Sequence, residues 1–129
     1  MGYISQVSCD KCGYEEEFFL GSGMMYHLPD FVKTLFSNET AAEIEKFKAN
    51  STNVSVVAEN VLALCETCGK LSVMHKAEFT APSGETAEFK SVCECGQNFS
   101  ELSGNYMQEG VLCPKCKAKL RIEETGFWD

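Results

Sequence analysis

Eight cysteines arranged as four short pairs constrain the fold of this 129-residue chain more than any other feature of its sequence. Two thiolates separated by one or two residues can hold one metal ion from a tight turn, and two such turns complete a tetrahedral Cys₄ site. Four pairs therefore supply two complete sites and leave no cysteine over. The pairs are Cys9 with Cys12, Cys65 with Cys68, Cys93 with Cys95, and Cys113 with Cys116.

The rest of the sequence favours metal ligands over disulfides. The first eight residues are too polar and too short for a signal peptide, and no apolar run approaches the roughly 20 residues that span a bilayer. We therefore expect a cytoplasmic protein with no membrane partner, in a compartment where such cysteines are more often metal ligands. In three pairs a glycine, whose backbone a tight turn can use, follows the second cysteine: Gly13, Gly69 and Gly96. A disulfide framework and a set of redox thiols are the alternatives.

Between the cysteine pairs, alternating apolar and polar residues and β-branched runs predict strands on both sides of each turn. The expected strands cover residues 3–8, 14–20, 54–64, 70–79, 86–92, 99–102, 106–112 and 117–122, with a short aromatic tail at Phe127 and Trp128.

The apolar period changes between residues 24 and 53, where we expect one or two helices over 29–49. Pro29 suits a helix start, and Thr40-Ala41-Ala42-Glu43 resembles a capping box. The helices are expected to cover a sheet and to place their large apolar residues in the core; a groove for a partner or ligand is the alternative. These residues are Met24, Met25, Phe31, Phe36 and Phe47.

The repeated order of strand, cysteine turn and strand resembles the zinc-ribbon superfamily, in which two such turns, called knuckles, clasp one metal ion. The resemblance covers most of the chain outside residues 24–53. It implies an α+β, mostly antiparallel β fold of tandem zinc-ribbon-like β-hairpins with a helical insertion in the first ribbon. The expected units are residues 1–80 and 81–129. The knuckles are Cys9-Asp-Lys-Cys12-Gly13, Cys65-Glu-Thr-Cys68-Gly69, Cys93-Glu-Cys95-Gly96 and Cys113-Pro-Lys-Cys116.

Two schemes could distribute the four knuckles between two ions. Sequential pairing joins the first knuckle to the second and the third to the fourth; nested pairing joins the first to the fourth and the second to the third. Loop-closure entropy separates the schemes by less than ~1 kcal/mol and does not decide between them. We favour sequential pairing, because the short interval between Cys95 and Cys113 makes a compact ribbon by itself.

A closed Cys₄ site has no open position for water or substrate, so two structural Zn²⁺ ions per chain are expected. The segment Cys9-Asp-Lys-Cys12-Gly13-Tyr14 looks like the first knuckle of a rubredoxin, and this resemblance keeps iron as the alternative. We interpret His27 and His75 as surface or strand-edge histidines, since eight cysteines already complete both sites. The run Glu15-Glu16-Glu17 is interpreted as a solvated face, and no catalytic motif is present, so no enzymatic activity is expected.

The charge of the chain affects which kind of partner it can bind. The formal net charge of −8 disfavours non-specific binding to nucleic acid. One local exception to this negative charge is a basic strip, which a strand would present on one face. The strip could contact phosphates, or it could protect a sheet edge against pairing with another sheet; we favour the protective role. The strip consists of Lys115, Lys117, Lys119 and Arg121.

The function we expect is a zinc-binding structural and interaction module, an intracellular adaptor or regulatory protein that contacts another protein. Two alternatives remain: a nucleic-acid-associated ribbon that uses the basic strip, and a rubredoxin-like iron electron carrier.

Overall fold

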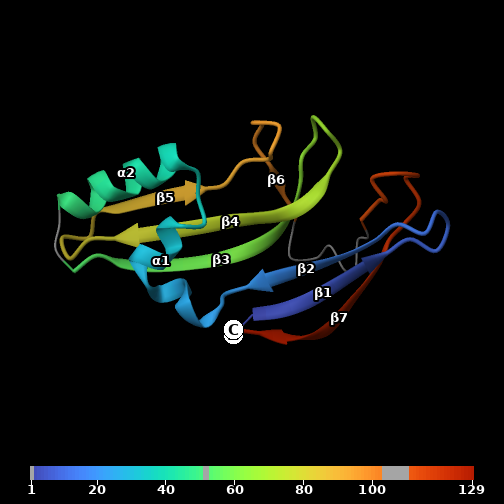
Figure 1. Cartoon of the computed structure of the whole chain (residues 1–129), viewed down its shortest axis with the longest axis horizontal. Coiled ribbons are helices and arrows are strands. Elements are labelled where there is room, and N and C mark those ends of the chain that lie inside the picture. The colour runs from blue at the N-terminus through green and yellow to red at the C-terminus, as the bar shows by residue number, and fades with distance from the viewer. Residues whose placement is uncertain (1, 51–52, 103–110) are drawn as a thin grey trace.

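One antiparallel sheet runs through the computed structural model, which describes residues 2–50, 53–102 and 111–129 (Figure 1). The strand order is β5-β4-β3-β2-β1-β7, and β6 pairs with β3. Every pairing among these strands is antiparallel, which confirms the expected α+β, mostly antiparallel fold. The strands are β1 (Gly2–Ser8), β2 (Glu15–Gly21), β3 (Ser55–Leu64), β4 (Leu71–Thr80), β5 (Thr86–Lys90), β6 (Ser100–Glu101) and β7 (Arg121–Trp128).

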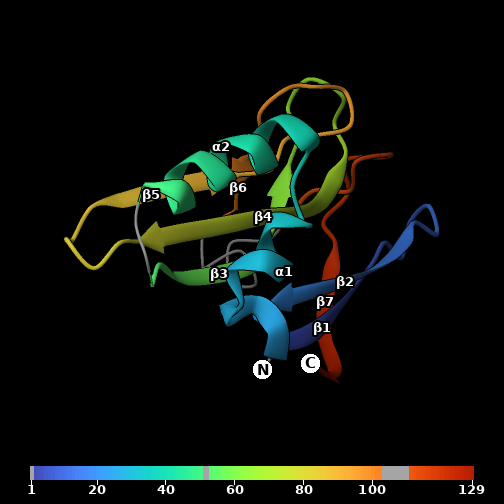
Figure 2. The same ribbon diagram turned by 60° about the vertical axis from the view of Figure 1, so that its left-hand side comes forward.

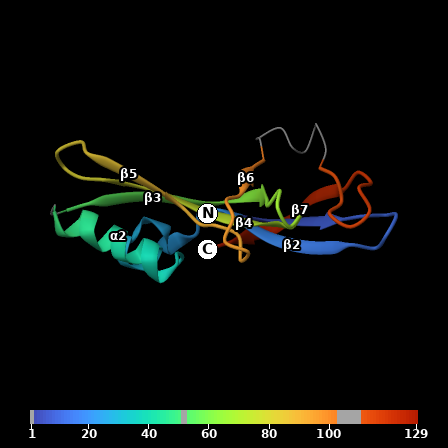
Figure 3. The same ribbon diagram turned by 90° about the horizontal axis from the view of Figure 1, so that it is seen from above.

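The helical segment between β2 and β3 covers one face of the β3–β5 half of the sheet (Figure 3). It consists of a 3₁₀ helix, η1 (Met24–His27), and two α-helices, α1 (Pro29–Lys33) and α2 (Asn38–Ala49), so the expectation of helices over 29–49 is confirmed. The cap of α2 differs from the expectation. Ser37 is the N-cap, its Oγ accepts a hydrogen bond from the backbone N–H of Thr40, and Thr40 itself lies in the first turn. None of these helices combines the length and the apolar character needed to cross a bilayer.

Two clusters of buried side chains lie along the sheet. The first lies under the helices and contains Tyr26, Val32, Ile44, Val56, Ala58, Ala77 and Phe79, with Phe31, Phe36 and Phe47 packed against it. The prediction that Met24 and Met25 lie in the core is wrong: they are 64% and 46% exposed, because η1 turns only Tyr26 inward.

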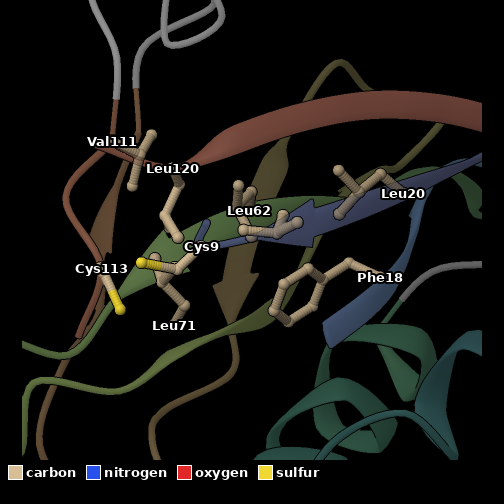
Figure 4. Close-up of a cluster of buried hydrophobic side chains, with 9 residues drawn as sticks. Cys9, Phe18, Leu20, Leu62, Leu71, Val111, Cys113 and Leu120 are labelled. Carbon is tan, nitrogen blue, oxygen red and sulfur yellow. The ribbon is translucent and has the colours of Figure 1, made fainter. Parts of the chain in front are cut away.

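The second cluster reaches the cysteines. It contains Val7, Cys9, Phe18, Leu20, Leu62, Leu71, Val111, Cys113 and Leu120. Figure 4 shows the sulfur atoms of Cys9 and Cys113 at the end of the cluster that lies away from Leu20 and Phe18. The apolar core of this half of the sheet is therefore continuous with a group of thiols.

The last strand is longer and later than expected. We predicted a strand over 117–122 and a separate aromatic tail, whereas β7 begins at Arg121 and includes Trp128. It pairs with β1 over the whole length of β1, from Ser8 opposite Arg121 to Gly2 opposite Trp128. The strand expected at 106–112 lies almost wholly outside the described residues, and Leu112 forms an isolated bridge with Lys119. The division into units of residues 1–80 and 81–129 stays a prediction.

Trp128 joins the end of β7 to the helical layer. Its indole occupies the space that a Cβ would need at Gly2 or at Gly23, so both positions require glycine. The indole Nε1–H donates to the carbonyl oxygen of Leu20 at 2.9 Å, and the ring meets Tyr26 edge-on with centroids 5.5 Å apart. The indole therefore contacts β1, β2 and η1 at once.

We expect Trp128→Ala to lower the free energy of unfolding by about 3 kcal/mol, because it removes a large packed ring and its hydrogen bond. The matched control is Phe127→Ala on the same strand. Phe127 is 74% exposed, and its loss should cost less than about 0.5 kcal/mol. Denaturant unfolding followed by far-UV circular dichroism measures both variants, and equal losses would contradict the role assigned to Trp128.

Candidate metal centres

The eight cysteines gather in two groups of four, and within each group all four Sγ atoms lie within 4.8 Å of one another. The first sulfur set consists of Cys9, Cys12, Cys113 and Cys116, and the second of Cys65, Cys68, Cys93 and Cys95. Four Sγ–Sγ distances between knuckles are 3.4, 3.5, 3.5 and 3.6 Å. A tetrahedron with zinc–sulfur bonds of about 2.3 Å has edges of about 3.8 Å. Both sets therefore fit one ion each.

The knuckles pair in the nested scheme, so the prediction of sequential pairing is wrong. In the first set, Cys9 and Cys116 are 107 residues apart in sequence, and their sulfur atoms are 3.4 Å apart. The β1–β7 pairing brings them together, because Ser8 and Arg121 are register partners directly beside the two knuckles.

The second set depends on a different pairing. The segment after β5 continues along β4, where the Ser91 N–H donates to the His75 carbonyl oxygen at 2.9 Å, and this places Cys93 beside Cys68. Figures 1 and 2 show each knuckle loop beside its partner, at two separate places on the molecule. The helical segment lies between the first and second knuckles in sequence, and because these two knuckles belong to different sites, it is not an insertion in a ribbon that they build together.

All four knuckles share one backbone pattern. The first cysteine of each accepts a hydrogen bond at its carbonyl oxygen from the N–H of the residue that follows the second cysteine, at 2.7 to 3.0 Å. That following residue has a left-handed backbone, with φ of +80° at Gly13, +74° at Gly69, +87° at Gly96 and +66° at Lys117. The third knuckle, which is one residue shorter, keeps the pattern.

Lys117 is the exception among the four, because a residue with a Cβ is strained in this region. The glycines after the other knuckles reach the same conformation without that cost. The left-handed residue also explains why no strand runs through residue 117.

Burial divides each knuckle into an inner and an outer cysteine. Cys9, Cys65, Cys93 and Cys113 are buried, whereas Cys12, Cys68 and Cys95 are exposed and Cys116 is half-buried. The inner sulfur atoms lie against the sheet and the outer ones face solvent at the tips of the loops. Because the inner sulfurs belong to the packed core, a metal ion held by each set would be attached to the sheet and not only to the loops.

In each set at least one inner thiol has a lowered pKa and at least one outer thiol a raised pKa. The Cys68 N–H is the main cause that lowers the pKa of Cys65 to about 7. Burial would raise the pKa of Cys113, but the N–H groups of Cys116 and Lys115 outweigh it and lower the value to about 6. The Tyr14 N–H lowers the pKa of Cys12, but burial and the neighbouring sulfur atoms raise it to about 12. At neutral pH each set thus offers thiolate to a cation, and binding must release the protons of the thiols with raised pKa values, such as Cys12 and Cys95.

The basic strip is exposed, and part of it is engaged with the first knuckle. Lys115, Lys117, Lys119 and Arg121 alternate with less exposed residues, although only Arg121 belongs to a strand. The Arg121 guanidinium donates to the Asp10 carboxylate at 2.9 Å, and the Lys115 ammonium lies 5.9 Å from the centre of the Tyr14 ring.

The two histidines differ. His27, in η1, is exposed, as the sequence interpretation expected. His75 lies on β4, between β3 and β5 and away from both sheet edges, and its Nδ1 is 2.7 Å from Asn60 Oδ1. The interpretation of His75 as a strand-edge or surface residue is therefore wrong. Asn60 and His75 are register partners of the β3–β4 hairpin, and no local pattern around either residue signals that contact.

Comparisons of the chain with protein-family models, with curated proteins and with solved structures found no significant match. The geometry of the two sulfur sets and of their surroundings is what indicates the function of this chain.

Two double variants, which share Cys12→Ser and differ in the second cysteine replaced, test the nested pairing. Cys12→Ser with Cys116→Ser removes two ligands from the first set and leaves the second complete, so the chain should retain one metal ion. Cys12→Ser with Cys68→Ser removes one ligand from each set and should weaken both sites. Elemental analysis after passage over a chelating resin gives the metal content per chain. Sequential pairing requires the reverse result, with one ion retained by the second variant and none by the first.

We expect Lys117→Gly to stabilise the metal-loaded chain by about 1 kcal/mol, because glycine adopts the left-handed backbone without strain. Lys119→Gly is the matched control: it removes the same charge two residues later, at a position without positive φ, and should destabilise by about 0.5 kcal/mol. Denaturation midpoints measure both effects, and a loss of stability in Lys117→Gly would refute the strain assigned to this knuckle.

Proposed function

We propose that this chain is a zinc-binding protein in which two closed Cys₄ sites are structural. The observation that carries the proposal is that all eight cysteines, and no other side chains, make two sets of four sulfurs with tetrahedral spacing in the part of the chain the structure describes. Four thiolates fill the coordination sphere of zinc, so neither ion would keep an open position for substrate. The zinc-ribbon resemblance of the knuckles supports the same conclusion.

Each ion would add a link between two segments that are otherwise held together only by strand pairing. In the first set, zinc would connect the turn between β1 and β2 with the segment that leads into β7. In the second, it would connect the turn between β3 and β4 with the segment after β5. Because unfolding would separate these segments, the free energy of metal binding becomes part of the free energy of folding.

The wider role that we propose is an interaction module that contacts another protein. Its support is that large apolar side chains remain exposed on η1 and beside it, where a protein surface is usually polar. Met24, Met25 and Leu28 lie in η1 or at its end, and the exposed Phe19 ring meets Trp128, which contacts Tyr26 of η1.

The two alternatives have weaker support. The basic strip would bind nucleic acid through four cations, but Arg121 already pairs with Asp10 and the chain carries a net charge of −8. Iron fits a Cys₄ tetrahedron as well as zinc does, so the ligand set alone does not separate a rubredoxin-like carrier from a structural zinc protein.

Elemental analysis and absorbance of the purified full chain test the proposal. We expect two zinc ions per chain, a colourless solution, and loss of cooperative unfolding when a strong chelator removes the metal. A red protein with iron in place of zinc would establish the electron-carrier alternative. Less than one metal ion of any kind per chain would overturn the metal-binding proposal altogether.

A further inference from the structure

A cavity of about 290 Å³ lies between the start of α2 and the part of the sheet next to the second sulfur set. Figure 2 shows α2 lying over β4 and β5 on this side of the sheet. Apolar walls come from Phe36, Val73, Val92 and Phe99, and the polar groups lining it include His75 and Ser91. A site with apolar walls and a few convergent polar groups is the usual form of a small-molecule pocket.

Hydrogen bonds fix the orientation and the tautomer of His75. The Asn60 Nδ2–H donates to the Phe19 carbonyl oxygen at 3.0 Å, so Asn60 Oδ1 faces the opposite way. That oxygen accepts from the Tyr26 hydroxyl at 3.1 Å and lies 2.7 Å from His75 Nδ1. Since a carboxamide oxygen only accepts hydrogen bonds, Nδ1 must carry a proton.

The other ring nitrogen of His75 is therefore a hydrogen-bond acceptor. Burial lowers the pKa of His75, so the ring is neutral at pH 7 and Nε2 has a free lone pair. Among the described residues, Nε2 makes no hydrogen bond. It is also not one of the fully buried side-chain atoms without a partner, so part of its surface is accessible. Because His75 lines the cavity, this nitrogen is open to it.

The charges around the cavity balance. Lys70 and Lys90 line it, but Lys70 pairs with Glu94 at 3.6 Å and Lys90 pairs with Glu88 at 3.4 Å. Cys93 of the second sulfur set also borders the cavity. An anion would meet Glu94 and the sulfur set, and a cation would meet both lysines. An uncharged occupant avoids both repulsions.

The aromatic side chains determine the shape of the occupant. Phe36 stands edge-on to His75, with ring centroids 6.4 Å apart and planes at 70°, and Phe99 adds a second ring to the lining. We propose that this cavity binds a small uncharged aromatic molecule that donates one N–H or O–H hydrogen bond to His75 Nε2. Such a ligand satisfies the acceptor, and its ring fills the apolar space between the helices and β4.

Indole and 1-methylindole are matched probes, because they share the ring and differ in the N–H donor. In ¹H–¹⁵N spectra of the metal-loaded full chain, we expect saturable shifts at the backbone amides of residues 73–75 and 91–92 with indole. The affinity for 1-methylindole should be at least about fivefold lower, which is the cost of one lost hydrogen bond. Equal affinity for the two probes, or no shifts up to about 10 mM indole, would overturn the proposal.

Two variants separate binding from folding. His75→Phe keeps an aromatic ring and removes the acceptor, and it should abolish the preference for indole. Because it also removes one of the two donors to Asn60 Oδ1, a second variant is needed. Val92→Trp places a large side chain in the cavity wall and should prevent binding, whereas Val57→Trp makes the same change at an exposed site outside the cavity lining. Indole binding that survives Val92→Trp would place the site elsewhere and refute the proposal.

The tautomer gives an independent readout. Long-range ¹H–¹⁵N correlations of the imidazole rings in the free protein should show the proton of His75 on Nδ1. Indole should shift the His75 Nε2 resonance and leave exposed His27 unchanged. A His75 ring protonated on Nε2 in the free protein would remove the acceptor on which the proposal depends.

Discussion

The pairing of the first strand with the last determines how the rest of the molecule is connected. β7 runs beside β1 over the full length of β1 and closes the sheet order on that side. The same contact sets the knuckle at Cys113 beside the knuckle at Cys9, and it carries Trp128 to Gly2 and Gly23, where the indole meets the helical layer. One strand pairing thus builds a sulfur set at one end and an aromatic contact at the other. A metal ion in the first set would hold this long-range pairing closed and would stabilise every contact along it.

The features that the sequence predicted correctly are local. Cysteine spacing predicted four turns, and the glycines after three of them indicated a permissive backbone, which the structure shows to be left-handed; both features depend on a few consecutive residues. Apolar periodicity predicted the helices over 29–49, because Val32 and Ile44 had to face a sheet. The cap at Ser37 was missed in favour of Thr40, although both lie within one turn of the same helix start. Capping patterns of this kind fix an end only to within a few residues.

What could not be predicted depends on contacts between distant segments. Loop-closure entropy changes slowly with loop length, so it gave no reason to prefer the nested knuckles over the sequential ones. The strand register decided the matter, through partners such as Ser8 and Arg121. His75 is a similar case. Its neighbours in sequence say nothing about Asn60, and only the β3–β4 register brings the two side chains together and directs the free ring nitrogen into a cavity.

The second sulfur set and the cavity share one segment of chain. Ser91 exchanges two hydrogen bonds with His75: its Oγ accepts from the His75 N–H at 2.8 Å, and its N–H donates to the His75 carbonyl oxygen at 2.9 Å. Two residues later, Cys93 enters the sulfur set, and Val92 between them lines the cavity. The position of the cavity wall therefore depends on the turn that brings Cys93 to Cys68. A metal ion in this set would hold the segment in place from one side, and a ligand against His75 would hold it from the other. Each would therefore favour the same arrangement of residues 91–93. By linkage, metal binding would raise the affinity for the ligand by the same factor as ligand binding would raise the affinity for the metal.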